Sequence, residues 1–176
     1  MDAARLVSAL RPLLDACGAR WALAGGFALA AWGSTRTTLD LDLVVGEDAR
    51  TSLLPRLTSE GFLTLLDLEG FTNLQHPDPE LGRLDLIWVD GSTRERLFAA
   101  AVTRPGPDGL PILVPAPEHL VAMKVKAIRN TPSRVLRDGE DLRFLLSTPG
   151  IDQNQARETF ARSGLLDLYE RFTAPP

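Results

Sequence analysis

The sequence predicts an α/β protein of the α+β kind, in which a small mixed sheet is flanked by helices and followed by a helical C-terminal extension. Three observations support this. Short runs of Leu, Val and Ile alternate with amphipathic segments over the first 115 residues, Pro115 and Pro117 then mark a break, and every later periodic segment has helical spacing. We therefore predict an α/β core over 1–115 and a helical part over 116–176.

The core is expected to begin with a helix whose leucines recur at helical spacing, with Pro12 as the one objection to it. Gly61 is expected to end a later helix that Asp48 caps, and a Pro-Gly-Pro-Asp-Gly run at 105–109 indicates a hairpin. The expected elements are helices at 3–16, 27–32, 48–60 and 93–101, strands at 21–24, 39–45, 62–68 and 84–89, a loop at 73–82, and a hairpin of 101–104 with 110–114.

The C-terminal part contains apolar stripes of helical period and no strand pattern. We expect four helices there, at 118–129, 135–147, 153–163 and 164–172.

Composition excludes several classes of function. No apolar run approaches the length of a membrane span, and the acidic start lacks the layout of a signal peptide, so a cytoplasmic protein without a membrane partner is expected. One cysteine, Cys17, and two histidines, His76 and His119, are too few for a cysteine or histidine metal site. The net charge of −4 provides no overall basic field for nucleic acid, although a local basic patch stays open.

The most informative segment is a double glycine followed by a strand with two acids. Gly25 and Gly26 follow a short apolar strand and precede a helix, a position where backbone N–H groups can bind a phosphate. Asp40 and Asp42 then alternate with Leu and Val, so both carboxylates point to one face, roughly 6.6 Å apart along the strand. This spacing suits one divalent cation or a pair of them.

A third acid, Asp85, lies in a later apolar strand and joins Asp40 and Asp42 if the two strands pair. The alternative is the solvated side of an edge strand, and Asp90 is a rival third acid, although Gly91 after it suggests a turn.

Two residues before the acidic strand also have two interpretations each. Arg36 either pairs with the acids or holds a triphosphate, and Thr38 either bonds a phosphate or caps a loop, the latter being favoured.

The only two lysines of the chain, Lys124 and Lys126, lie in one predicted helix. Lys124 falls near the centre of its apolar face and Lys126 on the polar side. In the next helix Asp138 belongs to an apolar stripe and Asp141 borders it. Lys124 therefore either forms an ion pair between helices or binds nucleotide phosphates, with Asp138 or Asp141 as a base or positioning group.

Together these residues resemble the polymerase-β-like nucleotidyltransferase superfamily, in particular the small bacterial AbiEii-like and MenT-like toxins and their uncharacterised relatives. Its first motif, Gly-Gly or Gly-Ser, then a helix and Arg-x-Thr-x-Asp-x-Asp, is similar to Gly25-Gly26 followed by 36–42. The later Lys and Lys/Arg-Asp-x-x-Asp motifs are similar to Lys124 and to the run 137–141, where arginine stands before the first Asp and Gly139 departs from a strong helix start.

The resemblance implies a nucleotidyltransferase fold and a set of site residues. It implies Mg²⁺ or Mn²⁺ as cofactor in a two-metal mechanism, with Asp40, Asp42 and Asp85 as catalytic metal ligands and Lys124 as a catalytic residue. The residues implied to bind the nucleotide are Gly25, Gly26, Arg36, Thr38, Lys124, Asp138 and Asp141.

The expected activity moves a nucleotide from an NTP, ATP among them, to a hydroxyl of RNA, tRNA or a small molecule. By the same resemblance the chain is a candidate toxin with a protein antitoxin as partner. The alternatives are an antibiotic-modifying nucleotidyltransferase and a non-catalytic nucleotide-binding or partner protein. The acidic charge favours a small-molecule acceptor over tRNA.

Overall fold

The computed structural model describes residues 1–174. The chain divides into two compact units, Met1–Pro115 and a second that begins at Ala116. Each unit is described by itself below.

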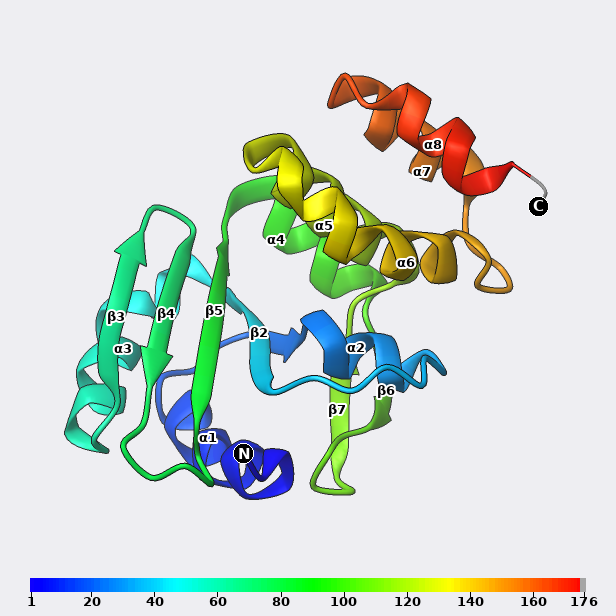
Figure 1. The fold of residues 1–176 in the computed structure, drawn as a ribbon. Coiled ribbons are helices and arrows are strands. Elements are labelled where there is room, and N and C mark those ends of the chain that lie inside the picture. The colour runs from blue at the N-terminus through cyan, green and yellow to red at the C-terminus, as the bar shows by residue number, and fades with distance from the viewer. Residues whose placement is uncertain (175–176) are drawn as a thin grey trace. The chain divides into compact units, whose positions relative to one another are not determined.

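The first unit is built on a five-stranded mixed sheet of order β1-β2-β5-β4-β3 (Figure 1). Strands β2 and β5 are parallel, and the other neighbouring pairs of this sheet are antiparallel. A separate hairpin pairs β6 with β7. The strands are β1 Trp21–Leu23, β2 Asp40–Gly46, β3 Leu63–Leu68, β4 Phe71–Gln75, β5 Arg83–Val89, β6 Val102–Pro105 and β7 Pro111–Val114.

Helices α1 and α3 cover one face of this sheet (Figure 1). Leu41, Leu84 and Leu74 form one row across β2, β5 and β4, and all three are fully buried on that face. Burial of such side chains is the main term that holds the helices to the sheet. The helices of this unit are α1 Ala3–Ala16, α2 Gly25–Ala31, the 3-10 helix η1 Glu47–Ala49, α3 Arg50–Ser59 and α4 Gly91–Ala100.

Most predicted elements are confirmed, and three details are corrected. Gly25 and Gly26 do not form a turn before the helix but its first turn. Asp48 does not cap α3; it lies in η1 and its Oδ2 pairs with Nη1 of Arg94 at 2.8 Å. The predicted loop at 73–82 contains the end of β4, because the polar residues of this strand find buried partners: Thr72 accepts a hydrogen bond from Nε1 of Trp88 at 2.8 Å.

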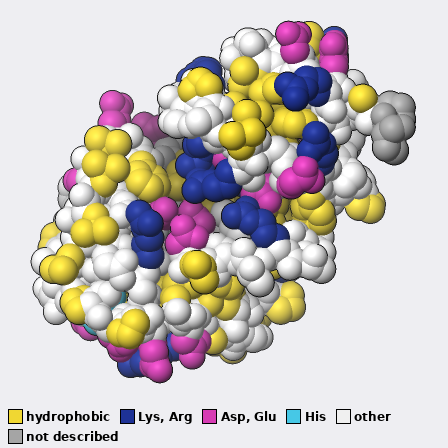
Figure 2. Space-filling model, in the orientation of Figure 1, with side chains coloured by type: hydrophobic (Ala, Val, Ile, Leu, Met, Phe, Trp, Pro, Cys, Tyr) yellow, Lys and Arg dark blue, Asp and Glu magenta, His cyan; other side chains and the backbone are white. Residues whose placement is uncertain are grey.

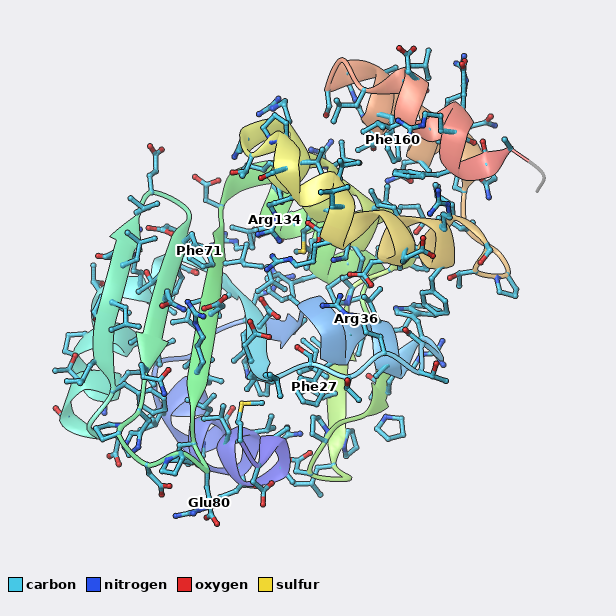
Figure 3. The ribbon with its side chains drawn as sticks, viewed as in Figure 1. Phe27, Arg36, Phe71, Glu80, Arg134 and Phe160 are labelled. Atoms are coloured by element: carbon cyan, nitrogen blue, oxygen red, sulfur yellow. The ribbon has the colours of Figure 1, made fainter. Side chains whose placement is uncertain are left out.

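The second unit is helical, as predicted. Its core includes Phe160, which is fully buried and packs against the rings of Tyr169 and Phe172 (Figure 3 labels Phe160). The helices of this unit are α5 Pro117–Asn130, the 3-10 helix η2 Pro132–Arg134, α6 Val135–Leu146, α7 Gln153–Arg162 and α8 Leu166–Thr173.

Among residues 1–174, no helix combines the length and the apolar character needed to cross a membrane.

Candidate active site

The predicted acids lie on the face of the sheet opposite the one that α1 and α3 cover. The register of β2 and β5 sets Asp42 directly opposite Asp85, so the strands pair as the third-acid hypothesis required. Adjacent strands lie about 4.8 Å apart, and directly paired residues point to the same side. Asp40 lies two residues before Asp42 and shares its face. In Figure 2 acidic side chains, in magenta, gather over β2.

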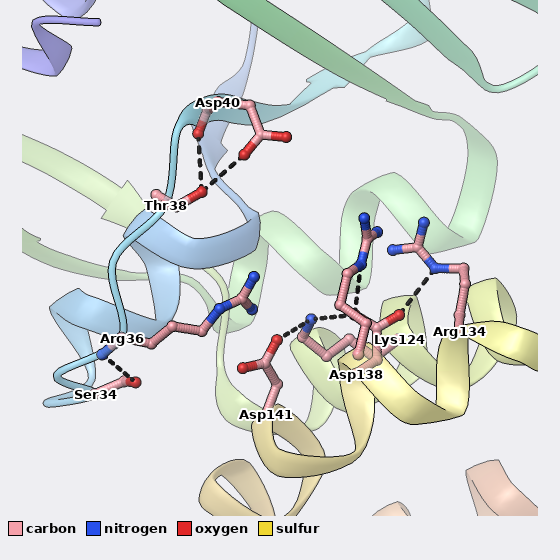
Figure 4. Close-up of polar contacts among 9 residues, drawn as sticks. Ser34, Arg36, Thr38, Asp40, Lys124, Arg134, Asp138 and Asp141 are labelled. Carbon is pink, nitrogen blue, oxygen red and sulfur yellow. Dashed lines mark hydrogen bonds and ion pairs between the residues drawn. The ribbon is translucent and has the colours of Figure 1, made fainter.

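Asp40 is held by the loop that leads into β2. Its Oδ1 accepts a hydrogen bond from Oγ1 of Thr38 at 2.8 Å, and the same hydroxyl lies 3.3 Å from the Asp40 carbonyl oxygen (Figure 4). A hydroxyl that donates to a carboxylate oxygen limits the rotation of the carboxyl group. Thr38 therefore orients Asp40, a role that the sequence interpretation did not include.

The double glycine gives these side chains room to approach the start of α2. A Cβ added to Gly25 would lie 1.9 Å from Oδ2 of Asp42, and one added to Gly26 would lie 2.6 Å from Cβ of Thr38. Gly25 also has φ +54°, in the left-handed region that glycine favours. The structure thus gives a packing reason for both glycines, and their predicted contact with a phosphate stays a prediction.

Asp85 has a partner that sequence reasoning missed. Its Oδ1 accepts a hydrogen bond from Nδ2 of Asn73, which is its direct register partner on β4. Asn73 is only 4% exposed, and its Oδ1 accepts from Nη2 of Arg83 at 3.3 Å. Once β4 is recognised as a strand, the alternation of Asn73 with buried Thr72 and Leu74 could have placed it on the acidic face.

The three acids fit a divalent cation by donor type and by backbone position. Carboxylate oxygens are the ligands that Mg²⁺ and Mn²⁺ prefer, and Asp42 faces Asp85 across two parallel strands. Over residues 1–174, however, no three His, Cys, Asp or Glu side chains are grouped as a metal-binding cluster. Thr38 and Asn73 each hold one of these carboxylates through a hydrogen bond.

Arg36 lies in the exposed loop after α2, on the same segment as Thr38 (Figure 3). Its backbone N–H donates to Oγ of Ser34 at 3.3 Å. The structure therefore places Gly25 against Asp42, Gly26 against Thr38 and Thr38 against Asp40. Arg36 has an exposed position in the same loop as Thr38.

The remaining predicted residues form a second cluster, within the helical unit. Nζ of Lys124 lies 3.0 Å from Oδ1 of Asp138 and 2.7 Å from Oδ2 of Asp141 (Figure 4). The two carboxylates are 2% and 4% exposed, and Nε of Arg134 binds Oδ2 of Asp138 at 2.8 Å. The ion pair between helices, one of the two interpretations of Lys124, is thus present and joins both acids at once.

Burial acts against the charge of Asp138, and its partners more than compensate. Desolvation alone would raise the pKa of the Asp138 carboxyl, but Lys124 and then Arg134 hold this pKa below its ordinary value. The charged form of Asp138 inside this unit therefore depends on the positive side chains of Lys124 and Arg134.

Comparisons with solved structures identify the fold. The chain is similar to the solution structure of the antibiotic-resistance factor ANT(2'')-Ia, at 17% identity and a TM-score of 0.67, over 97% of this chain and 98% of that one. It is also similar to the crystal structure of ANT(2'')-Ia with adenylyl-2''-tobramycin, at 16% identity and a TM-score of 0.64, over 92% of this chain and 96% of that one. A third similar structure is the lincosamide antibiotic adenylyltransferase LnuA bound to lincomycin, at 14% identity and a TM-score of 0.55, over 82% of this chain and 96% of that one.

No family model and no curated protein sequence matches the chain. The structural likeness establishes the class of fold: the chain has the fold of the nucleotidyltransferases, as the resemblance of its motifs implied. The narrower relation to AbiEii-like or MenT-like toxins stays a prediction from sequence.

Proposed function

We propose that this protein transfers a nucleotide from an NTP to a hydroxyl group of a small molecule and releases pyrophosphate. The observation that supports this most is the row formed by Asp42 and Asp85 on paired parallel strands, with Asp40 on the same face of a nucleotidyltransferase fold. Three acids on one face repel one another unless cations neutralise them, and this favours a metal-dependent enzyme over a non-catalytic binding protein.

In this proposal the acceptor oxygen attacks the α-phosphorus. The new bond joins that oxygen to phosphorus, the bond between the α-phosphorus and its bridging oxygen breaks, pyrophosphate leaves, and the acceptor hydroxyl loses its proton. Asp85 serves to orient the hydroxyl and receive that proton, while Asp40 and Asp42 act on the nucleotide. Such transfer depends mostly on positioning and on neutralising phosphate charge.

Mg²⁺ or Mn²⁺ held by Asp40, Asp42 and Asp85 would supply charge neutralisation at the phosphates. The backbone of Gly25 and Gly26 lies against Asp42 and Thr38, and we propose that it lines the nucleotide site. Thr38 keeps Asp40 in place through its hydroxyl.

Two observations favour a small-molecule acceptor: the net charge of the chain and the molecules bound in the similar structures. The chain carries a net charge of −4, whereas proteins that bind RNA without preference rely on positive charge. Two of the similar structures contain antibiotic-derived molecules, adenylyl-2''-tobramycin and lincomycin. The competing acceptor, RNA or tRNA, and the toxin role with an antitoxin follow from the sequence resemblance alone.

The test is to incubate the protein with Mg²⁺ and each NTP, with pools of hydroxylated small molecules or of total RNA as acceptor, and to measure pyrophosphate. We expect release with a small-molecule pool that Asp40→Asn abolishes. Asp90→Asn is the matched control, because Asp90 is an acid at the start of α4 and outside the acidic face. Release with RNA alone would shift the proposal to an RNA acceptor.

A further inference from the structure

We propose that Asn73 is a positioning residue for Asp85, and that Arg83 fixes the orientation of Asn73. This inference rests on the proposed function, since it assigns Asp85 its role in the transfer.

The three side chains form a closed triangle on neighbouring strands. Nδ2 of Asn73 donates to Oδ1 of Asp85, Nη2 of Arg83 donates to Oδ1 of Asn73 at 3.3 Å, and Nε of Arg83 lies 3.9 Å from Oδ1 of Asp85. These two contacts are made at the same carboxylate oxygen, Oδ1, and they limit the rotation of the carboxyl group.

Only one orientation of the Asn73 amide satisfies both neighbours. Its oxygen can accept from the guanidinium and its nitrogen can donate to the carboxylate, whereas the flipped amide would set donor against donor and acceptor against acceptor. Because Asn73 is 4% exposed, a flipped amide would leave its own buried polar atoms without hydrogen bonds, which is unfavourable. The charge of Arg83 thus orients the amide, and the amide orients Asp85.

Asn73 also changes how Arg83 and Asp85 meet. The two residues are two positions apart on β5 and share a face, which favours a direct ion pair. A close charge-assisted contact would measure about 2.7–2.9 Å, and bidentate pairing would occupy both carboxylate oxygens. The separation of 3.9 Å is longer, and Nδ2 of Asn73 donates to the same oxygen.

A purely structural role for Asn73 is the competing explanation, because a buried amide in a sheet can simply satisfy its neighbours. The two roles differ in what they predict for cation binding. A structural role affects the free energy of unfolding, whereas a positioning role affects Asp85 and everything that depends on its direction.

The first readout is the affinity for Mn²⁺, measured by calorimetry in the presence of a non-hydrolysable NTP analogue, so it needs no turnover. Loss of a residue that orients a metal ligand costs about 10- to 100-fold in affinity or activity. We expect Asn73→Ala to lose affinity in that range. Gln75→Ala is the matched control: Gln75 is an amide on the same strand and face, and its Nε2 bonds the His76 carbonyl oxygen at 3.0 Å.

The second readout is a double-mutant comparison of kcat and KM. In the wild-type background, Asn73→Ala should lower kcat about 10- to 100-fold with little change in KM for the NTP. In an Asp85→Asn background it should have no further effect, because the residue through which it acts is already changed.

Arg83→Gln gives a variant that keeps the fold even if Asn73→Ala does not, because Arg83 is 51% exposed. Arg83→Gln should also lower Mn²⁺ affinity and kcat, by a smaller factor than Asn73→Ala. Equal Mn²⁺ affinity in the Asn73 or Arg83 variant and the Gln75 control, or additive losses with Asp85→Asn, would overturn the positioning role. If the wild type binds Mn²⁺ but no acceptor is modified, the proposed function fails while the Mn²⁺ comparison still decides this inference.

Discussion

Replacement of Lys124 by methionine separates the two roles considered for this lysine. Methionine keeps most of the length and apolar contact of the stem and removes the charge that lies between Asp138 and Asp141. Arg134 still binds Asp138 in the variant, whereas the 2.7 Å contact from Lys124 to Asp141 is lost. Removing one partner of a buried pair costs about 3–5 kcal/mol, because the other charge stays buried without compensation.

For a chain of this length, each kcal/mol corresponds to about 2–4 °C in the unfolding temperature. We therefore expect Lys124→Met to lower Tm by roughly 10 °C, measured by circular dichroism at a helix signal. Lys126→Met is the matched control, because Lys126 is an exposed lysine of the same helix and should leave Tm nearly unchanged. Asp141→Asn added to Lys124→Met should recover much of the loss. A Tm that stays constant or rises in Lys124→Met refutes this reasoning and favours a lysine that serves nucleotide phosphates.

Three further predictions concern Asp138, Gly25 and the acids Asp40 and Asp85. Lys124 and Arg134 hold the pKa of Asp138 in the folded protein below its value in the unfolded chain. The charged Asp138 therefore stabilises the fold above about pH 4, and this stabilisation is lost as the pH falls through the folded pKa. Urea unfolding from pH 6 to pH 3 should show this decline, and Asp138→Asn should flatten it. Gly25→Ala should lower the free energy of unfolding, measured with urea, by at least about 1–2 kcal/mol, because Gly25 has φ +54° and an added Cβ would meet Asp42. Gly33→Ala is the control for backbone strain alone, because Gly33 has φ +105° and open space around it. Asp85→Asn should lower kcat more than nucleotide affinity measured by calorimetry, whereas Asp40→Asn should lower both, and equal effects of the two variants would contradict their separate roles.

The sequence predicted most of the elements because their patterns are local. The leucines of α1, the apolar strands β2 and β5, and the four C-terminal helices each have a period that one segment reveals by itself. Strand β4 could not be found this way. Its buried Thr72 depends on Trp88 and on Asp67, whose Oδ1 accepts from the threonine hydroxyl at 2.6 Å, and such partners appear only after folding.

The sequence predicted that three acids share one face of the sheet, but it did not predict the hydrogen bonds that hold two of them. Spacing alone sets Asp40 and Asp42 on one face, and pairing of apolar strands brings in Asp85. The hydrogen bonds from Thr38 to Asp40 and from Asn73 to Asp85 depend on side-chain geometry that no spacing rule contains. For the same reason the sequence could pose two roles for Lys124 but could not show that it pairs with two acids simultaneously.

The central claim is that the α-phosphorus of an NTP is transferred to an acceptor hydroxyl, and labelled nucleotides test it directly. The protein, Mg²⁺ and the acceptor pool that supports pyrophosphate release are incubated with NTP labelled at the α-phosphorus or at the γ-phosphorus, and the acceptor is then isolated. We predict that the acceptor carries the α label, that the γ label leaves with pyrophosphate, and that Asp40→Asn removes the transfer. Transfer of the γ label to the acceptor, or bound nucleotide with no label transferred to any pool, would contradict the account.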